Sequence, residues 1–134
     1  APAVFSREEK EKLASDITNL YTKVGLPEFY VNIHFTELPL DSFYVGKKSS
    51  QKSAFLSILH GARTFANKQQ QVNFMERIDS FLRPTMEPRE INWELVIEET
   101  SLELWRMNGL VPPPAGSEQE KEWARLNRPV KPYV

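Results

Sequence analysis

The feature that most constrains this chain is a strand, a helix and a second strand that follow one another across residues 54–98. Residues 54–60 read AFLSILH, an apolar run that is typical of a strand buried on both faces. Apolar residues recur at helical spacing in residues 64–83, and residues 91–98 again favour a strand. Because parallel strands need a crossover connection, this order predicts a β-α-β unit.

The predicted helix at residues 64–83 has a single apolar stripe and a clear end. Pro84 is expected to end the helix, since proline lacks the backbone N–H that a helix needs. The stripe that should face the core consists of Phe65, Val72, Met75, Ile78 and Leu82.

An earlier helix is predicted at residues 6–24. Ser6 and Glu9 match a capping box, in which each side chain accepts a hydrogen bond from the backbone N–H of the other residue. Gly25 and Pro27 follow the helical pattern and are expected to stop it. The apolar stripe of this helix consists of Leu13, Ile17, Leu20 and Val24.

Residues 29–38 alternate between apolar and polar side chains, which predicts a strand after this helix. The first half of the chain therefore resembles the helix and strand of the second half, but only residues 1–5 precede its helix. That segment is too short for a full strand, so we expect the leading strand of the first β-α-β half to be missing from this chain. The expected organisation is one domain at 1–134, with halves at 1–50 and 51–99 and a C-terminal arm at 100–134.

The C-terminal arm combines helical and proline-rich stretches. Residues 101–107 predict a short helix, and residues 117–127 predict another that opens with a capping pattern from Ser117 to Glu120. The stretch LVPPPAG between them is expected to be irregular. It is either an extended segment that wraps a neighbouring subunit or a surface loop.

Composition excludes several classes of site and partner. The 17 basic and 18 acidic side chains give a net charge of −1, which offers no argument for binding nucleic acid or an anionic membrane. The chain has no cysteine, and its two histidines, His34 and His60, are too few for a histidine-rich metal site. The sequence shows neither a membrane-spanning run nor a signal-peptide pattern, so we expect a cytoplasmic protein.

Five stretches carry a resemblance to a known family: DITNLY (16–21), FYVNIHFTE (29–37), HGAR (60–63), INWELVIEE (91–99) and NGLVPPPAGSEQEKEW (108–123). They resemble the tautomerase superfamily, most closely its cis-3-chloroacrylic acid dehalogenase-like group. The resemblance implies an α+β fold of two β-α-β units, with helices on one face of a sheet, assembled as a homotrimer. It also implies an amino-terminal proline that acts on small carboxylate substrates without a metal or organic cofactor.

The resemblance places candidate substrate-binding residues at the end of the predicted strand 54–60. Arg63 falls where the dehalogenase group has a substrate-binding arginine, and His60 falls where it has a second arginine. Tyr21 falls where that group has a histidine. Arginines of this kind hold a carboxylate by paired, charge-assisted hydrogen bonds. The residues alone leave a second interpretation open, in which His60 and Arg63 are polar residues of a strand end.

Other positions carry a different residue from the dehalogenase group, and the catalytic proline of the family has no counterpart in this sequence. Leu95 stands in place of a tyrosine, and Arg106, a further candidate for substrate binding, stands in place of a water-activating glutamate. Trp93 is a candidate pocket residue because its strand aligns with one that lines the family's site. The nitrogen of Pro2 is an amide and cannot act as a base, so the catalytic proline is expected upstream of Ala1.

These assignments leave three functions open. Keto–enol tautomerisation of an α-keto acid needs a proline base and a carboxylate anchor but no water activator, so it is the activity we expect. Hydrolytic dehalogenation or hydration of a 3-haloacrylate-type acid is the alternative reaction. The non-enzymatic alternative is a trimeric binding protein that has kept the fold and lost the catalytic activity.

Overall fold

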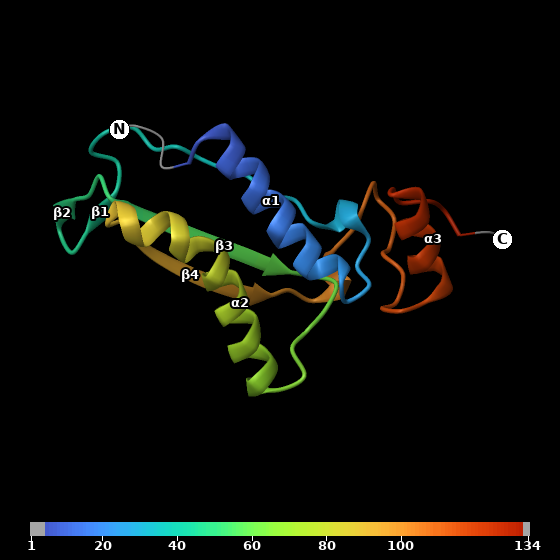
Figure 1. The fold of residues 1–134 in the computed structure, drawn as a ribbon. Coiled ribbons are helices and arrows are strands. Elements are labelled where there is room, and N and C mark those ends of the chain that lie inside the picture. Colours follow the sequence, from blue (N-terminus) through green and yellow to red (C-terminus); the bar gives the residue numbers. More distant parts are fainter. Residues whose placement is uncertain (1–4, 133–134) are drawn as a thin grey trace.

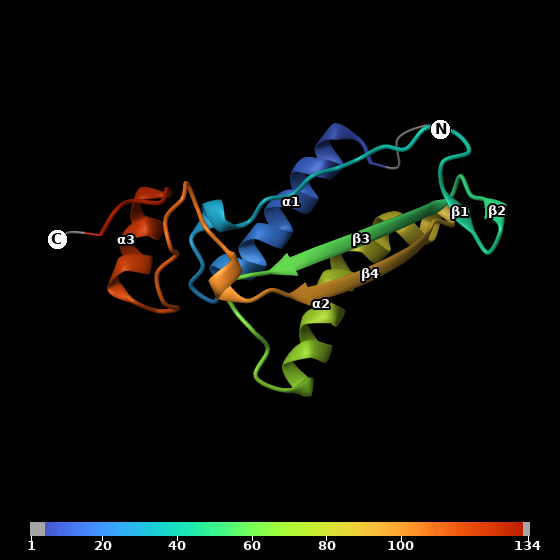
Figure 2. The same cartoon turned by 180° about the vertical axis from the view of Figure 1, so that it is seen from behind.

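The structure is a computed structural model that describes residues 5–132. Strands β3 (Ser53–His60) and β4 (Asn92–Glu99) pair in parallel, and helices α1 (Arg7–Thr22) and α2 (Lys68–Met86) lie on one face of this sheet (Figures 1 and 2). The register pairs Ser53 with Asn92 and His60 with Glu99, so the carboxyl ends of both strands meet at one edge. The β-α-β unit predicted across residues 54–98 is therefore confirmed.

Shorter elements complete the described chain. A hairpin of β1 (Tyr44–Val45) and β2 (Lys48–Ser49) precedes β3, and helix α3 (Glu118–Leu126) lies beyond the carboxyl ends of the strands (Figure 1). Three 3₁₀ turns are η1 (Glu28–Tyr30), η2 (Glu87–Arg89) and η3 (Leu102–Leu104). The helix expected at 101–107 is thus reduced to η3. Within residues 5–132 we find no helix with the length and apolar character that a membrane span requires.

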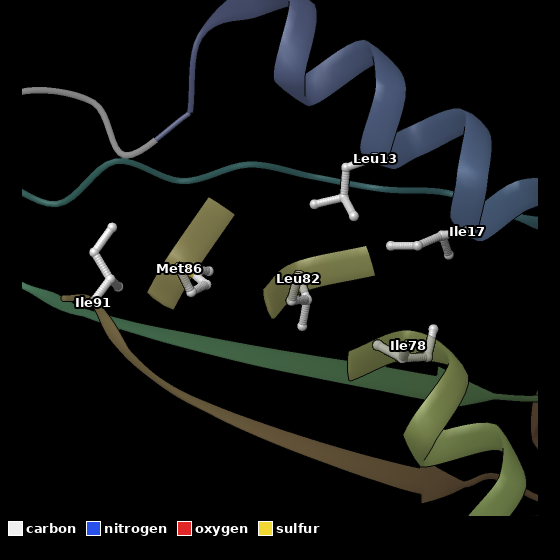
Figure 3. Close-up of a cluster of buried hydrophobic side chains, with 6 residues drawn as sticks. All are labelled: Leu13, Ile17, Ile78, Leu82, Met86 and Ile91. Carbon is white, nitrogen blue, oxygen red and sulfur yellow. The ribbon is translucent and has the colours of Figure 1, made fainter. Parts of the chain in front are cut away.

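The core lies between the two helices and the sheet (Figure 3). Its buried residues come from α1, from the second half of α2 and from the position just before β4. They are Leu13, Ile17, Ile78, Leu82, Met86 and Ile91. Full burial of an apolar side chain of this size stabilises a fold by roughly 1.5–3 kcal/mol, so this cluster is what holds the helices onto the sheet.

Helix α1 begins as predicted and ends earlier. The Ser6 hydroxyl accepts a hydrogen bond from the Glu9 N–H at 3.1 Å, and Glu9 Oε1 accepts one from the Ser6 N–H at 2.9 Å, which confirms the capping box. The helix ends at Thr22, and Gly25, with a φ of 94°, turns the chain away. Val24 is therefore 62% exposed, and its predicted place in the core stripe is wrong.

The strand predicted at residues 29–38 is wrong for the described chain. Residues 28–30 form η1, and residues 31–39 run on with no strand partner anywhere in residues 5–132. The alternation does report burial correctly, since Val31, Ile33 and Phe35 pack against the core. A strand also needs a hydrogen-bonded neighbour, which an alternating pattern of side chains cannot reveal.

Helix α2 is displaced relative to its prediction. It begins at Lys68, where the Asn67 side chain caps it, rather than at residue 64. It also continues through Pro84 to Met86, so the predicted end is wrong. Leu82 and Met86 are both fully buried on either side of the proline, and their packing outweighs the hydrogen bond that Pro84 cannot donate.

The apolar stripe of α2 is likewise shifted toward its C-terminal end. Val72 and Met75 are 40% and 36% exposed, so their predicted core positions are wrong. Figure 1 shows the reason: the first half of α2 projects past the edge of the sheet, and only the second half lies over the strands. The buried positions are therefore those of Ile78, Leu82 and Met86.

The second face of the sheet is left open by the described chain. Figure 2, which looks at this side, shows β3 and β4 in front of α2. Phe55 and Leu59 of β3 are 53% and 70% exposed, and Val96 of β4 is 40% exposed. The expectation that β3 is buried on both faces is wrong for the single chain, which carries a row of exposed apolar side chains there.

Candidate functional site

The candidate site lies where β3 ends and the chain turns toward α2. His60 is the last residue of β3 and is only 8% exposed, and residues 61–63 follow it. Gly61 lets the ring of Trp105 approach closely, because a Cβ at this position would lie 3.3 Å from Trp105 Cδ2. The turn after β3 is therefore packed against the C-terminal arm.

His60 and Tyr21 form one half of the site. The Tyr21 hydroxyl, on the last turn of α1, lies 2.5 Å from His60 Nε2. Phe65 and Phe74 enclose the pair, with each ring centroid 5.3 Å from that of His60. The structure thus brings together two candidate residues that are 39 positions apart in the sequence.

Burial sets the protonation of this pair. Burial lowers the pKa of His60, although the nearby carboxylate of Glu99 acts in the opposite direction, and burial raises the pKa of Tyr21 well above its usual value. At neutral pH the phenol therefore keeps its proton and the imidazole is uncharged. An imidazole whose Nε2 accepts the phenolic proton carries its own hydrogen on Nδ1, which is available as a donor.

Arg63 and Glu120 form the other half of the site. Arg63 Nη1 donates to Glu120 Oε2 at 3.0 Å, and Nη2 donates to Glu120 Oε1 at 2.8 Å. The Glu120 side chain is 3% exposed, whereas that of Arg63 is 27% exposed. Glu120 Oε1 also accepts a hydrogen bond from the backbone N–H of Gly116 at 2.9 Å, so the buried carboxylate is well satisfied.

One edge of the Arg63 guanidinium remains available. Nη1 also donates to the carbonyl of Ala62 at 3.0 Å, so three of the five N–H groups of the guanidinium are used. The other two, on Nε and Nη2, have no partner among residues 5–132. They form a second fork that matches the two oxygens of a carboxylate. Glu120 thus fixes the guanidinium and leaves this fork without a partner in the described part of the chain.

Helix α3 brings Glu120 to the site because its own contacts fix its position. Trp123 is fully buried, and its indole Nε1 donates to the carbonyl of Val130 at 2.9 Å. The side chain of Asn127 accepts a hydrogen bond from the backbone N–H of Phe29 at 3.0 Å. The C-terminal arm is therefore docked on η1, next to the turn that carries Arg63.

The two other predicted site residues make their hydrogen bonds outside the Tyr21–His60 and Arg63–Glu120 pairs. Trp93 pairs with Ala54, six residues before His60, which places it roughly 20 Å from that end of the sheet. Its indole Nε1 donates to Asp79 at 2.9 Å. Arg106 is exposed, and its Nη1 donates to the backbone carbonyls of Glu103 and Trp105.

Sequence reasoning missed the contribution of Glu120. We interpreted Glu120 only as the partner of Ser117 in a capping pattern, and the Ser117 hydroxyl does accept a hydrogen bond from the Glu120 N–H at 3.2 Å. The Glu120 carboxylate, however, turns to Arg63, which lies 57 positions away. The spacing of residues along the chain carries no signal for such a pair.

The comparisons with known proteins agree with this architecture. A protein-family model described as "Putative oxalocrotonate tautomerase enzyme" matches residues 1–128. The chain belongs to this tautomerase family. The family and the α+β tautomerase fold expected from the sequence are therefore confirmed for this tautomerase-family protein, whereas the homotrimer stays a prediction. No curated protein sequence matches it significantly.

Three solved structures resemble this tautomerase-family chain. A protein from Aspergillus fumigatus, described as a probable enzyme, is 45% identical with a TM-score of 0.88, over 97% of this chain and 91% of that one. RhCC from Rhodococcus jostii RHA1 is 38% identical with a TM-score of 0.91, over 98% of this chain and 94% of that one. N1, a member of the cis-3-chloroacrylic acid dehalogenase family, is 20% identical with a TM-score of 0.67, over 91% and 84%, and supports the fold.

The effects of replacing Arg63 and Glu120 on the free energy of unfolding should be strongly non-additive. We expect Arg63→Met to lower the free energy of unfolding by about 3 kcal/mol, because it leaves the buried Glu120 carboxylate without its counter-ion. Adding Glu120→Met should recover much of this loss in urea denaturation. The exposed pair of Arg7 and Glu11 offers a control, and Arg7→Met should cost less than about 1 kcal/mol. Additive losses in the double variant would contradict the coupling.

The lowered pKa of His60 predicts a pH dependence of stability. The unfolding free energy should fall as the pH drops below about 6.5, because the unfolded chain then binds a proton that the buried His60 resists. Above that pH both states carry a neutral imidazole, and the effect vanishes. His60→Gln should flatten this part of the profile, whereas His34→Gln, at an exposed position, should keep it. An unchanged slope in His60→Gln would show that His60 is not the group responsible.

Proposed function

We propose that the protein is a cofactor-independent tautomerase that interconverts the enol and keto forms of a small α-keto acid. Membership of the tautomerase family supports the class of reaction. The observation that carries the choice of substrate is the second fork of Arg63, held in place by Glu120 at the same strand end as the neutral His60–Tyr21 pair. A fork of two N–H groups on a fixed cation suits a carboxylate.

In the proposed mechanism Arg63 binds the substrate carboxylate and the amino-terminal proline, upstream of Ala1, moves the proton. The proline nitrogen accepts the proton of the enol hydroxyl and gives a proton to the neighbouring carbon. One O–H bond is broken and one C–H bond is formed, while the C=C bond becomes a C–C single bond and the C–O single bond becomes C=O. A desolvated secondary amine suits this step because its pKa falls toward neutral pH. His60, oriented by Tyr21, donates from Nδ1 to the oxygen on which charge develops.

Two positions favour tautomerisation over hydrolysis. Leu95 packs against the core and Arg106 is exposed, and neither side chain can remove a proton from water. Dehalogenation or hydration of a 3-haloacrylate-type acid is therefore the second choice of reaction. A protein that binds carboxylates without catalysing a reaction is the non-enzymatic alternative. It is favoured by the observation that Glu120 already neutralises the charge of Arg63.

We propose further that the protein works as a homotrimer whose subunits meet at the open face of the sheet. Phe55, Leu59 and Val96 are exposed there and form the kind of apolar surface that a subunit interface covers. Sedimentation should give the mass of three chains, and Leu59→Asp should shift it toward one chain, because the aspartate would be buried unpaired. A wild-type protein that sediments as a monomer would contradict this assembly.

The activity is tested with protein made from its natural start and with a verified free amino-terminal proline. We expect this protein to ketonise phenylenolpyruvate, measured by the loss of enol absorbance. Arg63→Lys keeps a positive charge for Glu120 but lacks the second fork. It should therefore raise KM about ten-fold or more, because a hydrogen bond to a charged group is lost.

The control for this test is Arg7→Lys, which should leave KM unchanged because Arg7 is exposed at the start of α1 and pairs with Glu11. Turnover with an unchanged KM in Arg63→Lys would refute the carboxylate anchor. Absence of turnover in the wild type would favour the binding protein.

A further inference from the structure

We propose that Tyr30 is a further substrate-binding residue, whose hydroxyl donates a hydrogen bond to the carboxylate that Arg63 holds. This inference rests on the proposed function, since it concerns the same ligand. It adds a neutral donor to the charged fork of Arg63 and so completes a carboxylate subsite from η1 and the turn after β3.

The first observation is the state of the Tyr30 hydroxyl. Its oxygen is buried, and among residues 5–132 it has no hydrogen-bond partner. Most buried polar groups in proteins are paired, and an unpaired buried hydroxyl is costly. A donor of this kind, kept beside a candidate binding residue, is explained if a ligand supplies the missing acceptor.

The second observation is that the Tyr30 ring is held in a fixed place. Its centroid lies 5.0 Å from that of Trp105 at an interplanar angle of 82°, and 6.3 Å from that of Trp123 at 88°. Both contacts have the edge-to-face geometry that aromatic rings prefer. Trp105 also packs over Gly61, two positions before Arg63, so the same ring fixes Tyr30 and the turn that carries the arginine.

The third observation is electrostatic proximity. The charges of Glu120 and Arg63 both act on the Tyr30 hydroxyl. Burial raises the pKa of Tyr30 to about 12, with Glu120 acting in the same direction and Arg63 in the opposite one. The hydroxyl therefore remains protonated at neutral pH and keeps a hydrogen that it can donate to a ligand.

The chemistry of these groups selects the ligand. The fork of Arg63 offers two N–H donors and Tyr30 offers one O–H donor, whereas the Glu120 oxygens are turned toward Arg63 and Gly116. Three donors match a carboxylate, which has two oxygens and room for more than two hydrogen bonds. An amide of the same shape lacks both the charge and the second acceptor oxygen.

The test is Tyr30→Phe in the full-length protein, with phenylpyruvate as the probe in titration calorimetry and phenylenolpyruvate in the activity assay. Phenylalanine keeps the ring contacts with Trp105 and Trp123 and removes only the hydroxyl. We expect Kd and KM to rise at least about five-fold, kcat to change less than two-fold, and the unfolding midpoint in urea to stay constant or rise. Tyr44→Phe, in the exposed hairpin, is the matched control and should change none of these.

Two results would overturn the assignment. Unchanged Kd and KM in Tyr30→Phe would show that the hydroxyl does not meet the ligand. A lower unfolding midpoint with no change in affinity would show that it makes a structural bond instead. If the wild type binds phenylpyruvate but does not turn over the enol, the proposed tautomerase activity is rejected. The Kd of Tyr30→Phe relative to the wild type then still tests the role of the Tyr30 hydroxyl. If the wild type shows neither binding nor turnover, both proposals fall.

Discussion

The ion pair between Arg63 and Glu120 is the interaction on which the arrangement of the site depends. It joins the turn after β3 to a helix 57 positions further along the chain, and it is largely removed from water. Two charges in such a place need further hydrogen bonds, and the carbonyl of Ala62 and the backbone N–H of Gly116 each supply one. The pair thus fixes the C-terminal arm and orients the guanidinium at the same time.

The candidate site lies at the carboxyl end of a sheet that has one covered face and one exposed face. Helices α1 and α2 cover one face of β3 and β4 through a core that is concentrated in the second half of α2 (Figure 3). The other face carries Phe55 and Leu59 on β3, and the carboxyl end of β3 carries His60. A subunit that covered this face would therefore come close to the candidate site, which links the proposed assembly to the proposed activity.

The sequence predicted the fold where side chains pack against near neighbours. The capping box of α1 follows from spacing within one helix, and the β-α-β unit follows from the order of its elements, because a crossover helix joins parallel strands. The strand at 29–38 failed because pairing requires a neighbour that alternation does not specify. Val72 and Met75 failed because helical spacing cannot show where α2 passes the edge of the sheet.

The site was predictable only in part for the same reason. The resemblance to the tautomerase family pointed to Arg63, His60 and Tyr21, and the structure brings the latter two into hydrogen-bond contact. The spacing of Glu120 predicts only a capping pattern, and Tyr30, whose hydroxyl is unpaired among residues 5–132, lies in a segment whose alternation predicts a strand. Both depend on how the C-terminal arm docks, which no local pattern records.

The measurement that tests the account most directly is a crystal structure of the full-length protein with phenylpyruvate bound. The account predicts that the ligand carboxylate lies within hydrogen-bond distance of Arg63 Nε and Nη2 while Glu120 keeps its contacts with Nη1 and Nη2. A carboxylate that displaces Glu120 would show that the second fork is not the anchor. A carboxylate bound away from Arg63 would contradict the central claim.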